Sequence, residues 1–401
     1  MGSASEQPKV VFLAPTISRK GGGLADPVRR TAQELQAEGH WQVQVISVED
    51  RFSAEDAPRW LPLKPELIRP WRPRSFGYAP AWKARLNEAQ GDLLHIHGLW
   101  TYLSLVGSRW SRRHGKPFIV SVHGMLNALA LQRSAWKKQL FARLFQKRIL
   151  GQAACVHALT VFEAEAIRAY GLKMPICVIP NAVDLPADNS ESHEAPPWAG
   201  QVEAGKKVLL FLSRLHPIKG LVPLLQGLHL LRQQQPALVN DWVLALAGFE
   251  EFNHRQELEQ MVTQLGLQKQ VLFLGPVFGA VKQAALEQAE AYVLPSLSEG
   301  MPIAILEAWS HCLPVLCTTT CHLPEGPEQG AAIAVAPTAA ALADGLAKML
   351  SCTAAERKSM GQRGRALVEQ RFLWKHVANG WDSVYRWIIE GSERPRQVSI
   401  L

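Results

Sequence analysis

The sequence predicts an α/β protein made of two doubly wound parallel sheets in tandem. Short apolar runs alternate with helical stretches along the chain, which is the pattern of βα units. A polar stretch containing Pro and Gly separates two such series at residues 186–206. The 401 residues, 47% of them hydrophobic, are enough for two cores.

The first series occupies residues 1–185. After the first strand, a Gly-rich loop leads into a helix that Gly39 closes. Two later runs each end in His-Gly, as buried strands running into a turn. The expected strands are Lys9–Pro15, Trp41–Val48, Asp92–Gly98, Pro117–Gly124, a run around Cys155, and Pro175–Asp184.

The second series occupies residues 207–371, and residues 372–401 form a tail. Strands are expected at the apolar runs that begin at Lys207, Trp242, Val271, Ala291, Leu313 and Ala331. The tail predicts an amphipathic helix whose apolar stripe packs back on the N-terminal domain. That stripe consists of Phe372, Trp374, Val377, Trp381, Val384, Tyr385 and Ile388.

The net charge of +8 is unevenly distributed. Residues 1–190 hold 25 Lys and Arg against 15 Asp and Glu, and residues 101–150 hold ten basic residues and no acidic one. This imbalance favours an anionic partner such as a membrane, a phosphorylated acceptor or a nucleic acid, although an ordinary solvated basic surface stays an alternative. The six Cys are too sparse for a disulfide framework, and no apolar run is typical of a signal peptide or membrane span, so we expect a cytoplasmic protein.

Two cations follow the first strand of the second series. Arg214 and Lys219, the latter next to Gly220, stand five positions apart at a strand-to-helix corner. Arg can fork onto phosphate oxygens and Lys adds a point charge, so the pair suits a diphosphate. Two exposed basic residues in a loop are the alternative.

Two glutamates lie around a Gly-Met-Pro corner in "SEGMPIAILEA". Pro302 suits the first position of a helix, which places Glu299 in the preceding loop and Glu307 inside the helix. A carboxylate accepts hydrogen bonds from two neighbouring hydroxyls, and the free N–H groups of the helix start face the same side. The two glutamates can therefore hold two different diols, a sugar and a ribose, and for an isolated pair an ordinary solvated helix surface is the alternative.

Together, "FLSRLHPIKG", "PSLSEGMPIAILEAWSHCLPVLCT", "VIPNAVD" and "HIHGLW…PFIVSVHGML" resemble the retaining glycosyltransferases of family 4 over nearly the whole chain. The resemblance implies a GT-B fold, with two Rossmann-like domains facing a central cleft. It implies that Arg214 and Lys219 bind the diphosphate of a nucleotide-sugar, Glu307 the ribose and Glu299 the donor sugar. The remaining donor contacts that it implies are Gly22, Gly23, Gly275, Val277, Gly300, Met301, Pro302 and Ile303.

The resemblance also implies an acceptor side. His123 is expected near the donor sugar and the acceptor, as a catalytic residue together with Glu299, Arg214 and Lys219. His97, Trp100 and Tyr102 follow as acceptor contacts, although a strand-end His or aromatic is often structural. The segment "HCLPVLCTTTCH" has irregular spacing for zinc, and packing is the favoured interpretation.

The expected function is retaining transfer of a hexose from a UDP- or GDP-sugar to a saccharide or lipid-linked saccharide, in polysaccharide, lipopolysaccharide or glycolipid synthesis. No cofactor is expected, and no metal, since the chain lacks an Asp-x-Asp motif. A GT-B phosphorylase or epimerase and a non-catalytic nucleotide-sugar binder are the alternatives. The basic helix expected at residues 134–150 suits either an anionic membrane surface on the inner face or core packing. No nucleic-acid module is recognisable.

Overall fold

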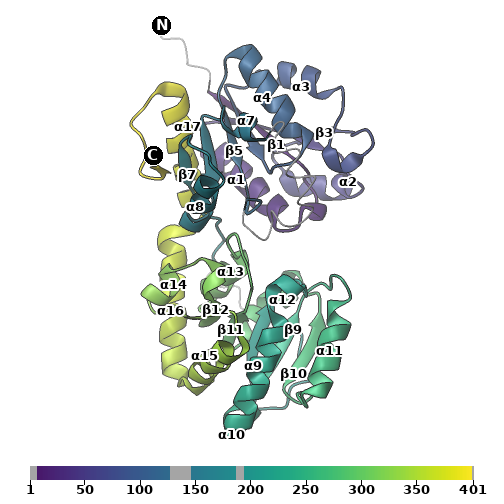
Figure 1. Ribbon diagram of the computed structural model, residues 1–401, viewed down its shortest axis with the longest axis vertical. Helices are drawn as coiled ribbons and strands as arrows, with labels where there is room; N and C mark the ends of the chain where they lie inside the picture. Colours follow the sequence, from purple (N-terminus) through teal and green to yellow (C-terminus); the bar gives the residue numbers. More distant parts are fainter. Residues whose placement is uncertain (1–6, 127–145, 187–193, 400–401) are drawn as a thin grey trace. The chain divides into compact units, whose positions relative to one another are not determined.

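The structure, a computed structural model, describes residues 7–126, 146–186 and 194–399. The chain divides into two compact units. Unit 1 contains the residues up to Asn181 together with Trp374–Leu401, and unit 2 contains Ala182–Leu373. Each unit is a sheet covered by helices, as Figure 1 shows. The expected fold class, two Rossmann-like sheets in tandem, is confirmed.

The sheet of unit 1 runs in the order β14-β7-β6-β5-β4-β1-β2-β3. Its strands are parallel except for β14, which pairs antiparallel with β7. The strand order reverses between β1 and β4, which makes a topological switch point there. The strands are β1 (Lys9–Ala14), β2 (Gln42–Val48), β3 (Glu66–Ile68), β4 (Leu93–His97), β5 (Phe118–Ser121), β6 (Cys155–Ala158), β7 (Ile176–Val178) and β14 (Val398–Ser399).

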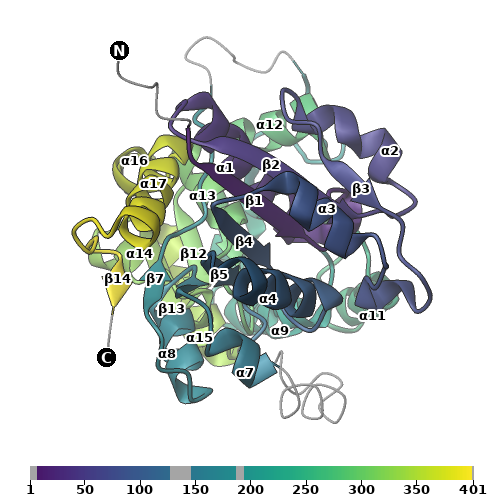
Figure 2. The same cartoon turned by 90° about the horizontal axis from the view of Figure 1, so that it is seen from above.

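The helices that cover the sheet of unit 1 also pack against one another. Figure 2 shows α4 beside α3 and α7, and α1 beside α17, in agreement with their contacts. The helices are α1 (Ala25–Ala37), α2 (Ser53–Asp56), α3 (Trp82–Ala89), α4 (Tyr102–His114), α7 (Lys147–Leu150), α8 (Val161–Ala169) and α17 (Trp374–Glu390), with 3-10 turns η1 (Arg19–Leu24), η2 (Ala57–Trp60) and η3 (Arg74–Phe76). Most of the helix expected at 134–150 lies outside the described residues.

The last helix, α17, belongs to unit 1 through side-chain hydrogen bonds as well as apolar packing. Trp41 Nε1 donates to Asp382 Oδ1 at 2.8 Å, and the buried residues Trp381 and Tyr385 face the sheet's histidines. The apolar stripe predicted for this helix wrongly included Phe372 as its first residue. The Phe372 N–H donates to the Val368 carbonyl, so Phe372 closes the preceding helix instead.

The sheet of unit 2 is parallel and runs in the order β10-β9-β8-β11-β12-β13. Its strand order reverses between β8 and β11. The strands are β8 (Lys207–Leu212), β9 (Trp242–Ala247), β10 (Val271–Gly275), β11 (Ala291–Leu294), β12 (Val315–Thr318) and β13 (Ala332–Val335). The helices are η5 (Pro217–Lys219), α9 (Leu221–Gln234), α10 (Pro236–Asn240), α11 (His254–Gln264), α12 (Gly279–Gln288), α13 (Ile303–Ser310), η6 (Thr319–Cys321), α14 (Glu325–Glu328), α15 (Ala339–Ser351) and α16 (Ala354–Arg371).

Two strands have no counterpart in the sequence prediction. β3 has three residues and β14 has two, which is too short for an alternating pattern to stand out. Within the described parts of the chain, no helix is both long enough and apolar enough to cross a bilayer.

Candidate active site

The carboxyl ends of β8 and β11 form the switch point of unit 2, which is where open α/β sheets bind ligands. The loops that follow these two strands contact each other directly. The Leu297 N–H donates to the Ile218 carbonyl at 2.8 Å. Gly220 has φ +68°, and a Cβ at this position would lie 1.9 Å from the Pro295 carbonyl oxygen. A glycine is therefore needed for the loops to approach this closely.

An ion pair joins the same two loops. Lys219 Nζ donates to Glu299 Oε1 at 2.5 Å, and Ser296 Oγ donates to the same oxygen at 2.5 Å. The two ionised side chains are only 11% and 13% exposed. Such a pair, largely shielded from water, fixes the positions of both charged groups.

Arg214 also follows β8 but contacts the loop on the other side. Its Nη1 donates to both carboxylate oxygens of Glu251, at 2.8 and 2.9 Å. Glu251 lies in the loop after β9, whereas Glu299 lies in the loop after β11. Arg214 and Lys219, the two residues expected to bind the diphosphate, thus both follow β8. Each is paired with a carboxylate from the loop after a different neighbouring strand.

Glu307 occupies the second turn of α13. Its Oε1 accepts a hydrogen bond from Lys282 Nζ of α12 at 2.6 Å. The helix begins at Ile303, so Pro302 is its N-cap and not its first residue as expected, and Met301 before it is buried. Gly300 through Ile303 therefore make the loop and helix start between Glu299 and Glu307, where first-turn N–H groups lack partners within the helix.

Exposed aromatic rings stand beside the expected base contacts Gly275 and Val277. Phe249 follows β9 and Phe278 follows β10, and their ring centroids are 5.1 Å apart. The side chains are 52% and 59% exposed, which is unusual for phenylalanine. The two rings are tilted by 50° to each other and offer an exposed apolar surface at the carboxyl edge of the sheet.

In unit 1, four histidines come together at the ends of β4, β5 and β6. His97 Nδ1 and His123 Nε2 are 3.1 Å apart, with ring centroids at 5.4 Å. Burial and the neighbouring His157 lower the pKa of His123 to about 3, so its ring is neutral at pH 7. His123 has φ +49°, a conformation uncommon for a residue with a side chain.

The other two histidines belong to a buried hydrogen-bond chain. Burial lowers the pKa of His157 to about 4, and its Nε2 lies 2.8 Å from the Ile179 carbonyl, so that nitrogen carries the proton. Its Nδ1 then accepts from Ser121 Oγ at 2.8 Å, and Ser121 accepts from His95 Nε2 at 2.6 Å. His95 Nδ1 is left to accept from the Tyr385 hydroxyl at 2.7 Å. This series of hydrogen bonds makes His95 a structural residue that connects α17 to the sheet.

His97 is not part of this series of hydrogen bonds. Its Nε2 is buried and has no hydrogen-bond partner among the described residues. It lines a cavity of about 20 Å³, enough for one water molecule, together with His123, Thr31 and Asn181. An imidazole nitrogen without a partner can form a hydrogen bond with a hydroxyl group at this position.

The other expected unit 1 residues lie around the strand ends. Gly22 has φ +54° in the turn after β1, and both it and Gly23 have open space where a Cβ would stand. Trp100 has φ +66° after β4, and the Tyr102 ring packs edge-on against Tyr78 with centroids 4.9 Å apart.

Comparison with known proteins identifies the family. Residues 21–186 match the family model "Glycosyltransferase Family 4", and residues 194–367 match "Glycosyl transferases group 1". The chain belongs to the GT-B glycosyltransferases of family 4.

The most similar relatives of this family 4 glycosyltransferase include a GDP-mannose:cellobiosyl-diphosphopolyprenol alpha-mannosyltransferase of Xanthomonas oryzae. It is 25% identical over 390 residues, covering 94% of this chain and 96% of the relative. Sucrose-phosphate synthase of Thermosynechococcus elongatus has the same fold, with a TM-score of 0.75, 20% identity and coverage of 96% and 100%. Anabaena HepE in complex with UDP and glucose gives a TM-score of 0.73, 20% identity and coverage of 94% and 99%.

Sequence reasoning did not single out Lys282, Glu251, Phe249 or Phe278 of this family 4 glycosyltransferase. Lys282 is an ordinary helical lysine whose partner lies 25 residues away, so no local pattern marks it. Phe249 lies two residues beyond β9 and Phe278 three residues beyond β10, and an apolar residue just past a strand end is a signal that could have been used. Within the described ranges, no group of three or more His, Cys, Asp and Glu side chains is arranged to hold a metal ion.

Proposed function

We propose that this glycosyltransferase moves a hexose from a UDP- or GDP-sugar to a saccharide or lipid-linked saccharide, with retention at the anomeric carbon and without a divalent metal. The observation that carries the proposal is the meeting of Lys219 and Glu299 at the switch point of unit 2. A cation for phosphate and a carboxylate for hydroxyls are held there side by side, as a nucleotide-sugar requires.

Unit 2 binds the donor in this proposal, and the diphosphate lies between Arg214 and Lys219. An ammonium group has three N–H donors and a guanidinium has five, so each can keep its carboxylate and still donate to phosphate oxygens. Glu251 and Glu299 act as internal counter-ions that hold the two cations in place before the donor arrives.

The rest of the donor follows the loops of unit 2. Glu307, oriented by Lys282, accepts hydrogen bonds from the ribose hydroxyls, and Glu299 accepts from the sugar. The N–H groups between Gly300 and Ile303 face the donor at the helix start. The base lies at Gly275 and Val277, where the rings of Phe249 and Phe278 provide an apolar surface for stacking.

Unit 1 supplies the acceptor side in this proposal. The neutral ring of His123 contacts the reacting sugars as a hydrogen-bond partner and not as a cation. His97 orients it through their shared hydrogen bond, while Trp100 and Tyr102 offer aromatic surface to the acceptor. Gly22 and Gly23, after β1, are donor contacts in this proposal, since they leave backbone space for a phosphate of the donor.

The reaction needs no protein nucleophile. The bond between the anomeric carbon and the diphosphate oxygen breaks, and the acceptor oxygen bonds to the same face of that carbon. The acceptor proton passes to the departing diphosphate, whose negative charge Arg214 and Lys219 stabilise. Catalysis is then mostly positioning and stabilisation of the leaving group.

The relatives support this choice of substrates. The Xanthomonas enzyme is named for GDP-mannose, a diphosphopolyprenol-linked disaccharide and an alpha product, and HepE was crystallised with UDP and glucose. A lipid-linked acceptor would place the enzyme at the inner face of a membrane, in the synthesis of a polysaccharide, lipopolysaccharide or glycolipid.

A thermal-shift screen with UDP, GDP, ADP and TDP, with and without magnesium, tests the donor assignment. A ligand at a hundredfold excess over its dissociation constant stabilises the folded state by about 2.7 kcal/mol. We expect UDP or GDP to raise the melting temperature equally with and without magnesium. A shift that depends on magnesium would contradict the metal-independent part of the proposal.

Matched variants then test the site. Glu307→Ala should weaken donor binding, and Lys219→Ala should also slow transfer by about 10²–10³-fold, as loss of a charged transition-state donor does. Lys269→Ala is the control, since this exposed lysine precedes β10 at the opposite edge of the sheet. Unchanged donor affinity and turnover in both site variants would refute the assignment, and NMR of the product's anomeric proton tests retention.

A further inference from the structure

A buried glutamate beside the histidines of unit 1 has no role in the reaction proposed above. Glu163 is the third residue of α8, and its side chain is almost fully buried. Its Oε1 accepts a hydrogen bond from the Gly124 N–H, and its Oε2 accepts from the Leu159 N–H at 2.6 Å. One carboxylate therefore connects the loop after β5 to the loop after β6, the neighbouring strand in the sheet.

Helix capping explains only half of this arrangement. A carboxylate in the first turn of a helix is favoured by the positive end of the helix dipole, and Thr160, the N-cap of α8, accepts from the Glu163 N–H. These interactions account for the bond to Leu159, which directly precedes the N-cap. They do not account for the bond to Gly124, which follows a different strand and lies 39 residues earlier in the chain.

The Glu163 carboxylate is held by backbone groups and not by a cation. Burial raises the pKa of Glu163, while its two N–H donors act in the opposite direction and favour the ionised form. Within the described ranges, no basic side chain forms an ion pair with it. A buried carboxylate without a cation destabilises a fold, and carboxylates with a shifted pKa gather at functional sites.

The peptide that Glu163 holds is the one that follows His123. His123 has φ +49° and Gly124 has φ +76°, so two successive residues are left-handed. A residue with a side chain keeps such a conformation only where the surrounding contacts impose it. Because a peptide group is planar, fixing the Gly124 N–H fixes the backbone on one side of His123. That backbone sets the direction in which the His123 ring meets His97, with Nε2 and Nδ1 3.1 Å apart.

We propose that Glu163 is a positioning residue for His123. Its carboxylate keeps the turn after β5 in the conformation that presents the His123 ring to the reacting sugars. The inference rests on the role proposed above for His123 in sugar transfer. Glu163 itself contacts neither donor nor acceptor, so its loss should slow the reaction without weakening binding of the donor in unit 2.

Proton–nitrogen NMR of the full chain with isotope-labelled histidine tests the position of His123 without any substrate. The ring signal that disappears in His123→Ala identifies the residue. Burial holds the pKa of His123 at about 3, and the rings of His97 and His157 that face it are neutral as well. Glu163→Gln replaces one carboxylate oxygen by an amide donor, which cannot accept from an N–H. We expect the His123 ring of this variant to become exposed and partly protonated at pH 6, near its ordinary pKa of 6.5. An unchanged ring signal would overturn the proposal.

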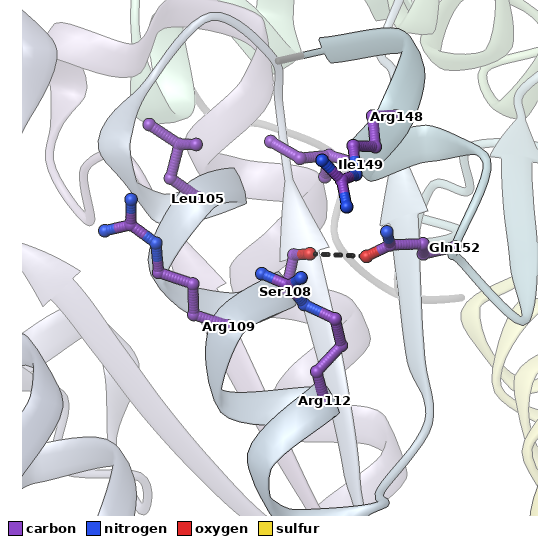
Figure 3. A pocket seen from close by; sticks show the side chains of 7 residues that line it. All are labelled: Leu105, Ser108, Arg109, Arg112, Arg148, Ile149 and Gln152. Atoms are coloured by element: carbon purple, nitrogen blue, oxygen red, sulfur yellow. Dashed lines mark hydrogen bonds between the residues drawn. The ribbon is translucent and has the colours of Figure 1, made fainter.

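Ser108→Ala is the matched control for the loss of a buried side-chain hydrogen bond. Ser108 Oγ on α4 donates to Gln152 Oε1 at 3.1 Å, as Figure 3 shows, and Gln152 precedes β6 at the opposite edge of the sheet from His123. This variant should leave the His123 signal and turnover unchanged. An equal effect of Ser108→Ala would overturn the proposal in favour of a general loss of stability.

A second variant, Glu163→Asp, keeps the charge at the start of α8 but is one methylene shorter. It should lose the bond to Gly124 and behave as Glu163→Gln does, and circular dichroism melting should show that the variants fold. Unchanged His123 signals and unchanged turnover in Glu163→Asp would also contradict the positioning role.

Turnover, followed as release of GDP from GDP-mannose or of UDP from UDP-glucose, tests the consequence for the reaction. Glu163→Gln should lower kcat by about tenfold to a hundredfold, as a small misplacement of a reacting group does, and leave the KM of the donor unchanged. Glu163→Gln/His123→Ala should be no slower than His123→Ala, because Glu163 acts through that ring; additive losses would overturn the proposal. Full turnover of His123→Ala would refute the proposed function of His123 and this inference with it. A slow His123→Ala beside a fast Glu163→Gln would refute the inference alone.

Discussion

The substitution Gly220→Ala tests whether the loops after β8 and β11 touch as closely as the site requires. A Cβ at residue 220 would lie 1.9 Å from the Pro295 carbonyl oxygen and 2.9 Å from its carbonyl carbon. Real Cβ atoms essentially never come within 3.0 Å of such neighbours. Because the opposing atoms belong to the backbone, no side-chain rotation relieves the clash, and the loops must separate.

The cost of this separation can be isolated with Gly266→Ala. Gly266 has φ +69° against +68° at Gly220, but its nearest neighbour is the end of the Arg232 side chain at 3.5 Å. Both substitutions therefore share the cost of a left-handed backbone, about 1–2 kcal/mol. Gly220→Ala carries in addition an overpacking cost of about 1–3 kcal/mol.

Differential scanning calorimetry and nucleotide titration measure the two consequences. Each kcal/mol lowers the melting temperature by about 2–4 °C for a cooperative unit of 150–250 residues, so Gly220→Ala should melt several degrees below Gly266→Ala. It should also bind UDP or GDP more than about tenfold more weakly, since Lys219 moves with residue 220. Equal melting temperatures and equal affinities in the two variants would refute the contact between the loops.

Three further predictions concern buried polar groups. In a double-mutant cycle, Lys219→Met and Glu299→Gln should each lower the free energy of unfolding by about 3 kcal/mol. The double variant should lose less than the sum of the two by more than about 0.5 kcal/mol. Additive losses would contradict the ion pair. The pKa of His157 is about 4 in the folded protein against 6.5 in the unfolded chain, so the unfolded state binds more protons between these values. Stability should therefore fall as the pH drops from 6.5 towards 4, by about 1.4 kcal/mol per pH unit for this residue, and melting curves of His157→Gln should show a smaller fall. Tyr385→Phe removes the donor to the buried His95 Nδ1 and should cost about 1–3 kcal/mol in urea unfolding, with no measurable loss arguing against the hydrogen-bond chain.

The fold class followed from the sequence alone, and so did the choice of residues proposed for the donor side. Alternating apolar runs located the long strands, because a parallel strand buried on both faces must be apolar throughout. Gly220, Lys219 and the Glu299–Glu307 spacing sit in short stretches of chain, where local turn and helix-start geometry decides which residues are adjacent. The same reasoning missed β3 and β14, whose few residues carry no period.

Which charged groups form pairs can be seen only in the three-dimensional structure. Lys219 and Glu299 are 80 residues apart, and Arg214 and Glu251 are 37 apart. These pairs form because β8 lies between β9 and β11 in the sheet, so the loops after all three strands share one edge. Strand order is fixed by the packing of whole βα units, and the spacing of residues along the chain carries no record of it.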